Sequence, residues 1–143
     1  MEKKKVLIGV IVLVIIVVAI ILGVVIIQNN EKDKVKDLVT EYFSLVNDKN
    51  YEELYSKVAS MNMSKDDFVT RNKNIYEGID CANIEINIKN VEKADKGYNI
   101  TYNEKFFTSA GEVEFDNTAN VVKENKELKL YWTQKIGHFL IRY

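Results

Sequence analysis

The feature that most constrains this 143-residue chain is an uninterrupted apolar run over residues 6–27. Of its 22 residues, 19 are Val, Leu or Ile, and the other three are Gly9, Ala19 and Gly23. As an α-helix the run would be about 33 Å long at 1.5 Å per residue, which matches a bilayer hydrocarbon core of about 30 Å. Because a helix of this composition is apolar on every side, it is typical of a membrane span.

The residues around the run favour a permanent anchor over a cleaved signal. A signal peptide has a shorter apolar region, of about 7–15 residues, followed by a small-residue cleavage site. Here Gln28-Asn29-Asn30 follows the run and offers no such site, and no acidic residue stands early in the run, as a pilin-type helix would require. Three lysines, at positions 3–5, precede it. The positive-inside rule therefore predicts a single-pass cell-membrane protein with residues 1–5 cytoplasmic, 6–27 in the membrane and 28–143 extracytoplasmic.

The extracytoplasmic part has the composition of one ordinary domain. It contains 17 Lys and Arg (20 less three at positions 3–5) and 20 Asp and Glu (21 less Glu2), a net charge of −3. Interspersed charges of both signs argue against nucleic-acid binding, which needs a basic face. Cys81 is the only cysteine, so no internal disulfide can form, and we expect it to be a small, buried or half-buried residue.

Helical periodicity dominates the first half of this domain. Residues 31–46 carry apolar side chains at helical spacing and follow a very short linker, Gln28 to Asn30. A second, short helix is predicted after Asn50, a plausible N-cap. A third is predicted to begin at the Ser64 cap and to end at Gly78, acting as a left-handed terminator.

After Gly78 the apolar period changes from helical to alternating. Strands are predicted around residues 84–88, over 97–108, over 112–122 and over 128–132, with turns between them. Helices followed by a run of antiparallel strands indicate an α+β domain, in which a curved sheet carries helices on one face.

Several short motifs, taken in order, point to a known family. They are Tyr51-Glu-Glu-Leu-Tyr-Ser, Met63-Ser-Lys-Asp-Asp-Phe-Val, Asn74-Ile-Tyr-Glu-Gly-Ile, Ala110-Gly-Glu-Val-Glu-Phe-Asp, Val121-Val-Lys-Glu-Asn and Leu130-Tyr-Trp132. Over residues 31–135 the chain resembles the N-terminal domain of the low-affinity class B penicillin-binding proteins of Gram-positive bacteria. The resemblance implies a nuclear transport factor 2-like (NTF2-like) cone, with three helices packed on a curved antiparallel sheet of about four strands. It also implies a non-catalytic domain that holds a transpeptidase away from the membrane.

The chain departs from that family after Trp132, where the usual Ile/Phe-Pro segment is missing. It contains neither Ser-x-x-Lys nor Lys-Thr-Gly, the motifs that carry the nucleophile and its supporting elements in serine acyl-transferases. Penicillin-binding activity therefore does not carry over.

Few residues suggest chemistry. His138 is the only histidine, and the acids Glu85, Glu112, Glu114 and Asp116 alternate with apolar residues, so they should point to solvent. The sequence has no His/Cys cluster for a metal and no clustered glycines for a phosphate. We thus predict no catalytic, cofactor-binding or metal-binding residues. Six aromatic residues are candidates for lining a pocket, although packing in the core is favoured for them: Tyr42, Tyr55, Tyr76, Tyr98, Tyr102 and Trp132.

Three hypotheses for function remain. The leading one is a non-enzymatic, membrane-tethered module that serves as a spacer or as a docking surface for cell-wall synthesis proteins, with a link to antibiotic response. The second is an enzyme or small-ligand binder that uses the cone cavity, which a titrating Asp or Glu with a strongly perturbed pKa would favour. The third is the front end of a longer penicillin-binding protein.

Overall fold

The computed structural model describes residues 2–131 of the chain. It contains two compact units, Met1–Asp33 and Lys34–Tyr143. Helix α1 (Glu2–Asn47) begins in the first unit and ends in the second. Residues 28–30 are therefore helical, and the prediction of a separate linker there is wrong. The reason is that these polar residues include no Gly or Pro, so the backbone hydrogen bonding of the helix continues through them.

The apolar run lies in the first unit as a helix with exposed side chains. Among the described residues, α1 is the one helix long and apolar enough to cross a membrane. Its large side chains are open to the surroundings, as in Leu13 at 66% and Ile26 at 67% of their full exposure. The long apolar helix is thus confirmed, whereas its orientation across a membrane stays a prediction.

Two short helical segments follow α1 in the second unit. They are α2 (Tyr51–Leu54) and the 3-10 helix η1 (Tyr55–Lys57). Asn50 caps α2 as predicted, because its Oδ1 accepts a hydrogen bond from the backbone N–H of Glu53 at 3.3 Å.

Helix α3 (Lys65–Gly78) begins as the sequence indicates and ends differently. The Ser64 hydroxyl accepts a hydrogen bond from the N–H of Asp67 at 3.1 Å, the N-cap interaction. Gly78, however, is the last helical residue, and the left-handed backbone occurs at Asp80, with φ of 50°. The prediction of Gly78 as terminator is wrong because a short polar side chain such as Asp also tolerates this conformation.

The sheet contains four antiparallel strands in the order β1-β2-β3-β4. The strands are β1 (Cys81–Ala94), β2 (Gly97–Thr108), β3 (Gly111–Glu124) and β4 (Glu127–Tyr131). Strand β1 extends well beyond the predicted residues 84–88, because a register shift between Ile88 and Asn90 moves the buried side from Ile84 to Val91. Such a bulge conceals the simple alternation that the sequence pattern relies on.

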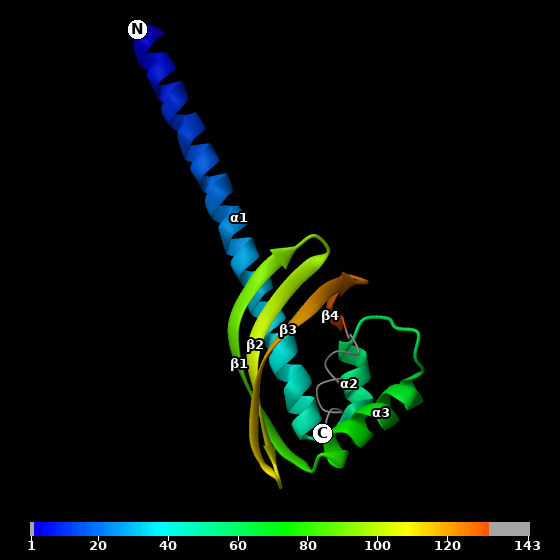
Figure 1. Ribbon diagram of the computed structural model, residues 1–143. Helices are drawn as coiled ribbons and strands as arrows, with labels where there is room; N and C mark the ends of the chain where they lie inside the picture. The colour runs from blue at the N-terminus through cyan, green and yellow to red at the C-terminus, as the bar shows by residue number, and fades with distance from the viewer. Residues whose placement is uncertain (1, 132–143) are drawn as a thin grey trace. The chain divides into compact units, whose positions relative to one another are not determined.

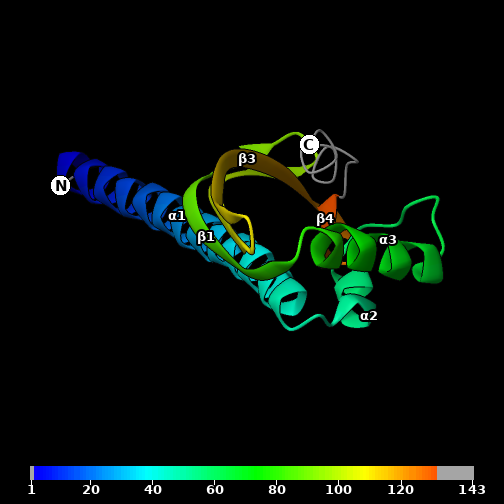
Figure 2. The same ribbon diagram turned by 60° about the horizontal axis from the view of Figure 1, so that its bottom comes forward.

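The core lies between the helices and the inner face of the bent sheet (Figures 1 and 2). We call the residues of β2 and β3 that face this core the inner row and those on the opposite face the outer row. On β2 the inner row consists of five buried residues: Tyr98, Ile100, Tyr102, Glu104 and Phe106. The C-terminal part of α1 packs against this row, with the Phe43 ring 5.6 Å from the ring of Tyr102. The α+β fold is as predicted.

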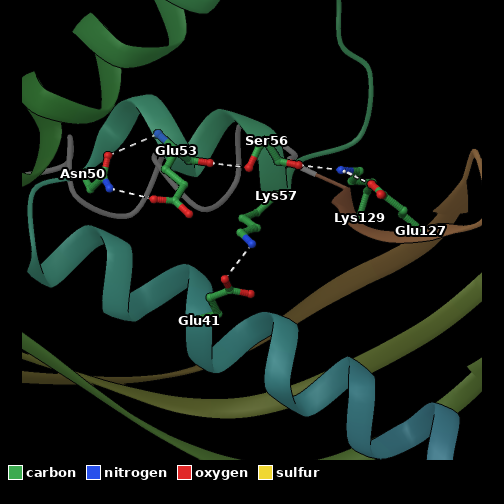
Figure 3. A network of polar contacts seen from close by, with 7 residues as sticks. All are labelled: Glu41, Asn50, Glu53, Ser56, Lys57, Glu127 and Lys129. Atoms are coloured by element: carbon green, nitrogen blue, oxygen red, sulfur yellow. Dashed lines mark hydrogen bonds and ion pairs between the residues drawn. The ribbon is translucent and has the colours of Figure 1, made fainter.

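Polar contacts fasten η1 to its neighbours (Figure 3). The Lys57 ammonium lies 2.6 Å from the Glu41 carboxylate on α1. The Lys129 ammonium on β4 donates to the backbone carbonyl of Ser56 at 2.6 Å and pairs with Glu127 at 2.8 Å. These contacts hold the short helical segment against both α1 and the edge of the sheet.

The two outermost strands of the sheet both have polar partners along their outer edges. At β4, Val58 forms a parallel bridge with Leu130, and the Ala59 N–H donates to the Leu130 carbonyl at 2.8 Å. At β1, the Asn47 side chain donates to the Ile84 carbonyl at 2.9 Å and accepts from the Ile84 N–H at 2.8 Å. An amide side chain therefore takes the place of a neighbouring strand at that position.

Candidate functional site

A carboxyl group lies within the core, on the inner row of β2. Glu104 is only 2% exposed, and the inner-row neighbours Tyr102 and Phe106 on either side of it are also buried. Strand alternation places it there, because every second residue from Tyr98 onward faces the helices. A buried carboxyl without a charged partner is uncommon, since transfer out of water penalises its ionised form.

One hydrogen bond supports the Glu104 side chain. The Asn117 amide on β3 donates to Oε2 of Glu104 at 2.5 Å, while Oε1 has no hydrogen-bond partner among the described residues. Burial raises the pKa of Glu104 from its ordinary value of 4.5 to about 7, and the Asn117 hydrogen bond acts in the opposite direction. Desolvation therefore outweighs the hydrogen bond, and the group changes charge near neutral pH.

Three tyrosines from different elements lie near this carboxyl. Burial raises the pKa of the Tyr76 phenol on α3, and the nearby Tyr42 and Glu104 raise it further. Burial also raises the pKa of Tyr102, with added effects from Glu104 and Tyr42. The Tyr76 and Tyr102 phenols therefore stay neutral at physiological pH, and Glu104, whose pKa is about 7, lies among aromatic rings.

The structure brings together only part of the predicted aromatic set. Tyr42, Tyr76 and Tyr102 converge near Glu104, as just described. Tyr55 lies elsewhere, with its hydroxyl donating to the Met63 carbonyl at 3.3 Å and its ring 5.4 Å from that of Phe68. Tyr98 is buried near the opposite end of β2, beside Lys93 and Val121 in the sheet register. Trp132 lies outside the described residues, and a pocket lined by this set remains a prediction.

Sequence reasoning missed Glu104 and its partner Asn117. The signal was present, because Tyr98, Ile100 and Tyr102 alternate along the strand predicted over residues 97–108, and the next residue in the same alternation is Glu104. A charged residue on an apolar face is easily mistaken for the end of the pattern. Asn117 carried no such signal, since its closeness to Glu104 depends on the β2–β3 register, which sets it opposite Tyr102.

The acids predicted to face solvent do so. Glu85, Glu112, Glu114 and Asp116 are all exposed on the outer side of the sheet. Two lysines lie among them, with Lys105 2.7 Å from Glu112 and Lys89 2.6 Å from Asp116. His138, the only histidine of the sequence, lies outside the described residues.

Cys81 is half-buried, as expected. Its thiol donates to the Asn83 carbonyl at 3.4 Å, and burial raises its pKa, so it stays protonated and unreactive near neutral pH. Within residues 8–131, no group of three or more His, Cys, Asp or Glu side chains is arranged to hold a metal ion. The chemistry that these side chains can offer is therefore proton binding, or pairing with a cation, at Glu104.

Comparison with known proteins identifies the family of the folded unit. Residues 34–138 match the family described as the NTF2-like N-terminal transpeptidase domain. The chain belongs to this family. Penicillin-binding protein 3 of Bacillus subtilis (strain 168) is 29% identical over 110 residues, which are 72% of this chain and 16% of that protein. The chain therefore spans less than a fifth of the length of this relative, and it corresponds to an N-terminal domain separate from a transpeptidase domain.

Solved structures agree on the fold of this NTF2-like domain. An NTF-2-like protein of unknown function from Shewanella oneidensis MR-1 superposes with a TM-score of 0.57 at 11% identity, covering 68% of this chain and 92% of that one. The protein Aln2 from a Streptomyces species gives a TM-score of 0.50 at 10% identity, covering 68% and 82%. At such low identity the likeness is one of fold alone, and it confirms the NTF2-like cone.

Proposed function

We propose that this chain is a membrane-tethered, extracytoplasmic and non-catalytic module that docks proteins of cell-wall synthesis. The observation that carries the proposal is the match of residues 34–138 to an N-terminal transpeptidase domain, which begins within helix α1 shortly after an apolar stretch with the length and composition of a membrane anchor. An anchor followed by such a domain would keep a bound partner close to the outer surface of the cell membrane. The same arrangement would let the domain act as a spacer.

The side chains of the folded unit support a role in binding rather than catalysis. The acids Glu85, Glu112, Glu114 and Asp116 lie exposed on the outer face of the sheet, whereas on the inner row of β2 aromatic and aliphatic residues pack around Glu104. The Ser-x-x-Lys and Lys-Thr-Gly motifs of serine acyl-transferases do not occur in the sequence. The exposed side chains of such a domain can contact a partner protein.

Protease treatment of intact cells tests the membrane topology. After the wall is removed, external protease should digest a tag at the C-terminus and spare a tag at the N-terminus, because the lysines at positions 3–5 favour the cytoplasm. A cytoplasmic protein serves as the control for leakage. A C-terminal tag that survives until the cells are lysed would show the reverse orientation.

Crosslinking in living cells tests docking. The full chain should capture transpeptidases or other wall-synthesis proteins, and a chain reduced to residues 1–33 should capture none of them, because it lacks the folded unit. Equal capture by both chains would assign the contacts to the anchor and exclude docking by the domain.

Glu104 supports a second candidate function, a small-ligand site within the cone. A carboxylate surrounded by tyrosines attracts an organic cation through charge and through the faces of the rings. The candidate predicts that tetramethylammonium binds the full chain in nanodiscs more weakly once Glu104→Gln is introduced. Equal binding of this probe to both chains, or none to either, would remove the candidate.

A further inference from the structure

The surroundings of Glu104 are poorly suited to a negative charge. The polar and titratable groups around it come from five elements: Tyr42 on α1, Tyr76 on α3, Cys81 on β1, Tyr102 on β2 and Asn117 on β3. Among the described residues, no lysine or arginine pairs with its carboxylate. Only the Asn117 amide donates a hydrogen bond to it. An ionised Glu104 therefore keeps one hydrogen bond in place of the several that a carboxylate makes in water.

Helix α3 is held to the core by fewer buried side chains than α1 is. In the second unit α1 buries seven apolar side chains: Val35, Leu38, Val39, Tyr42, Phe43, Leu45 and Val46. Helix α3 buries only Phe68, Asn72 and Tyr76. The Asn72 side-chain amide donates to the Phe68 carbonyl of its own helix at 2.8 Å, so this hydrogen bond does not tie α3 to the sheet. Elements with few buried apolar contacts open at the lowest free energy.

The connections of α3 allow it to move while the rest of the unit stays in place. Strands β1, β2 and β3 are joined by long antiparallel ladders, so none of them can leave Glu104 without breaking the sheet. Helix α3 instead lies between two non-helical segments, residues 58–64 before it and residues 79–80 after it, and it leads directly into β1 (Figure 1). Water can therefore reach Glu104 at the lowest cost by displacement of α3 and its Tyr76 ring.

We propose that Glu104 and helix α3 form a pH-sensitive switch. The protonated carboxyl keeps α3 closed against the sheet, and the ionised carboxylate favours an open state in which α3 moves away and water reaches Glu104. Opening also exposes Phe68 and Tyr76, which are 0% and 5% exposed in the closed state. The switch is a property of the folded unit alone, so it depends neither on the membrane orientation nor on the docking function proposed above.

The direction and size of the effect follow from proton binding. Burial raises the pKa of Glu104 from 4.5 to about 7 in the closed state, and contact with water in the open state returns it towards 4.5. The closed state therefore binds the proton more tightly, and the open fraction grows about tenfold for each pH unit between these two pKa values and levels off above the higher one. Between pH 6 and pH 8, opening of α3 should rise about tenfold.

Hydrogen exchange of the full chain in nanodiscs tests the switch. After correction for the intrinsic effect of pH on amide exchange, the amides of residues 69–78 in α3 should open more often than those of β2. Their opening should also depend less on urea, because local opening exposes less surface than unfolding of the whole unit. Its frequency should rise about tenfold from pH 6 to pH 8. Local opening that does not change with pH, or α3 amides with the same urea dependence as β2, overturns the proposal.

Three variants assign the effect to Glu104. Glu104→Gln cannot ionise, so its α3 should open equally often at both pH values, whereas the matched control Glu114→Gln, on the outer row, should keep the rise. Asn117→Ala retains the carboxyl but removes the hydrogen bond that lowers its pKa, so the rise should level off at a higher pH. A rise that persists in Glu104→Gln, or a plateau that Asn117→Ala does not move, would contradict the switch. A fall in opening as the pH rises would show that a cation pairs with the ionised carboxylate, which also contradicts it.

Cys81, at the start of β1, provides an independent readout. Its thiol is half-buried just after α3, so opening should expose it to methyl methanethiosulfonate. The labelling rate of the unmodified chain, divided by that of Glu104→Gln at the same pH, should therefore rise from pH 6 to pH 8. A direct effect of charge has the opposite sign, because ionised Glu104 raises the pKa of the Cys81 thiol and so lowers its reactive thiolate fraction. A ratio that falls or stays constant as the pH rises would refute opening at α3.

Discussion

The two faces of β2 and β3 impose opposite conditions on the same kind of residue. Glu104 and Glu114 are both glutamates on neighbouring strands, but Glu104 is 2% exposed among aromatic rings and Glu114 is exposed to water. The first takes up a proton near neutral pH because burial raises its pKa to about 7. The second lies near Lys105 on a wet surface. Position on the pleat, rather than residue type, therefore decides what each carboxyl does.

This contrast divides the work of the sheet. The inner row provides packing, and its one carboxyl makes stability depend on pH. The outer row presents charged side chains that another molecule can reach. Substitutions on the inner row should therefore change stability, whereas those on the outer row should change recognition and leave stability nearly untouched.

The largest effect on the free energy of unfolding is expected from Tyr102→Ala on the inner row. Its side chain is 1% exposed, and its ring packs 5.6 Å from that of Phe43, so truncation leaves a cavity. Loss of a buried aromatic side chain typically costs about 3–5 kcal/mol. Urea unfolding of the full chain in nanodiscs should show this loss. The control is Thr101→Ala, because Thr101 is adjacent to Tyr102 in the sequence but lies on the outer row; it should change the free energy of unfolding by no more than about 0.5 kcal/mol. Similar losses for the two variants would contradict the division of the faces.

Glu104→Gln should remove most of the pH dependence of stability. Because the pKa of Glu104 is raised from 4.5 to about 7 on folding, the folded state holds this proton more tightly than the unfolded state. The unmodified chain is then most stable below pH 4.5 with respect to this group, loses stability as the pH rises to 7, and levels off above that. This shift in the pKa of Glu104 corresponds to a change of about 3 kcal/mol in the free energy of unfolding.

Unfolding measured at pH 5 and pH 8 should therefore show opposite effects for this variant. Glu104→Gln should be more stable than the unmodified chain at pH 8 and slightly less stable at pH 5, where the protonated acid has no charge to desolvate. The exposed Glu114→Gln serves as the control and should leave the pH profile unchanged. A profile that is unaltered by Glu104→Gln would mean that Glu104 is ionised within the fold.

A smaller effect is expected from Asn117→Ala. This change removes the Asn117 side-chain amide, which donates a hydrogen bond to Oε2 of Glu104. In the unmodified chain that hydrogen bond lowers the pKa of Glu104, so its loss should raise the pKa. Hydrogen bonds to charged groups are worth about 1.5–3 kcal/mol and neutral ones about 0.5–1.5 kcal/mol. The loss should thus be greater at pH 8 than at pH 5, and the midpoint of the pH dependence should move upward. A loss of equal size at both pH values would indicate that Asn117 acts through packing alone.

The sequence predicted the elements whose signals are local. Strand β2 was assigned to the residues that the structure gives it, because Gly97 and the alternation from Tyr98 mark it clearly. Asn50 and Ser64 were recognised as caps, since a cap acts over three residues. The end of α3 was wrong, because either a Gly or a short polar residue can adopt the left-handed backbone, and the sequence offered both Gly78 and Asp80.

The candidate site was harder to predict because it depends on contacts between distant segments. The raised pKa of Glu104 depends on burial beneath α1 and α3 and on the register that brings Asn117 to it. Local patterns thus indicated which residues face inwards but not which of them meet.

The smallest effect is expected from Lys89→Ala on the outer face. The Lys89 ammonium lies 2.6 Å from the Asp116 carboxylate, and both side chains are largely exposed, so water and salt screen the pair. The urea midpoint should therefore change by no more than the error of the measurement, and added salt should remove any difference. A clear loss of stability would show that the outer face also holds the fold together, and the division between the two faces would then be incomplete.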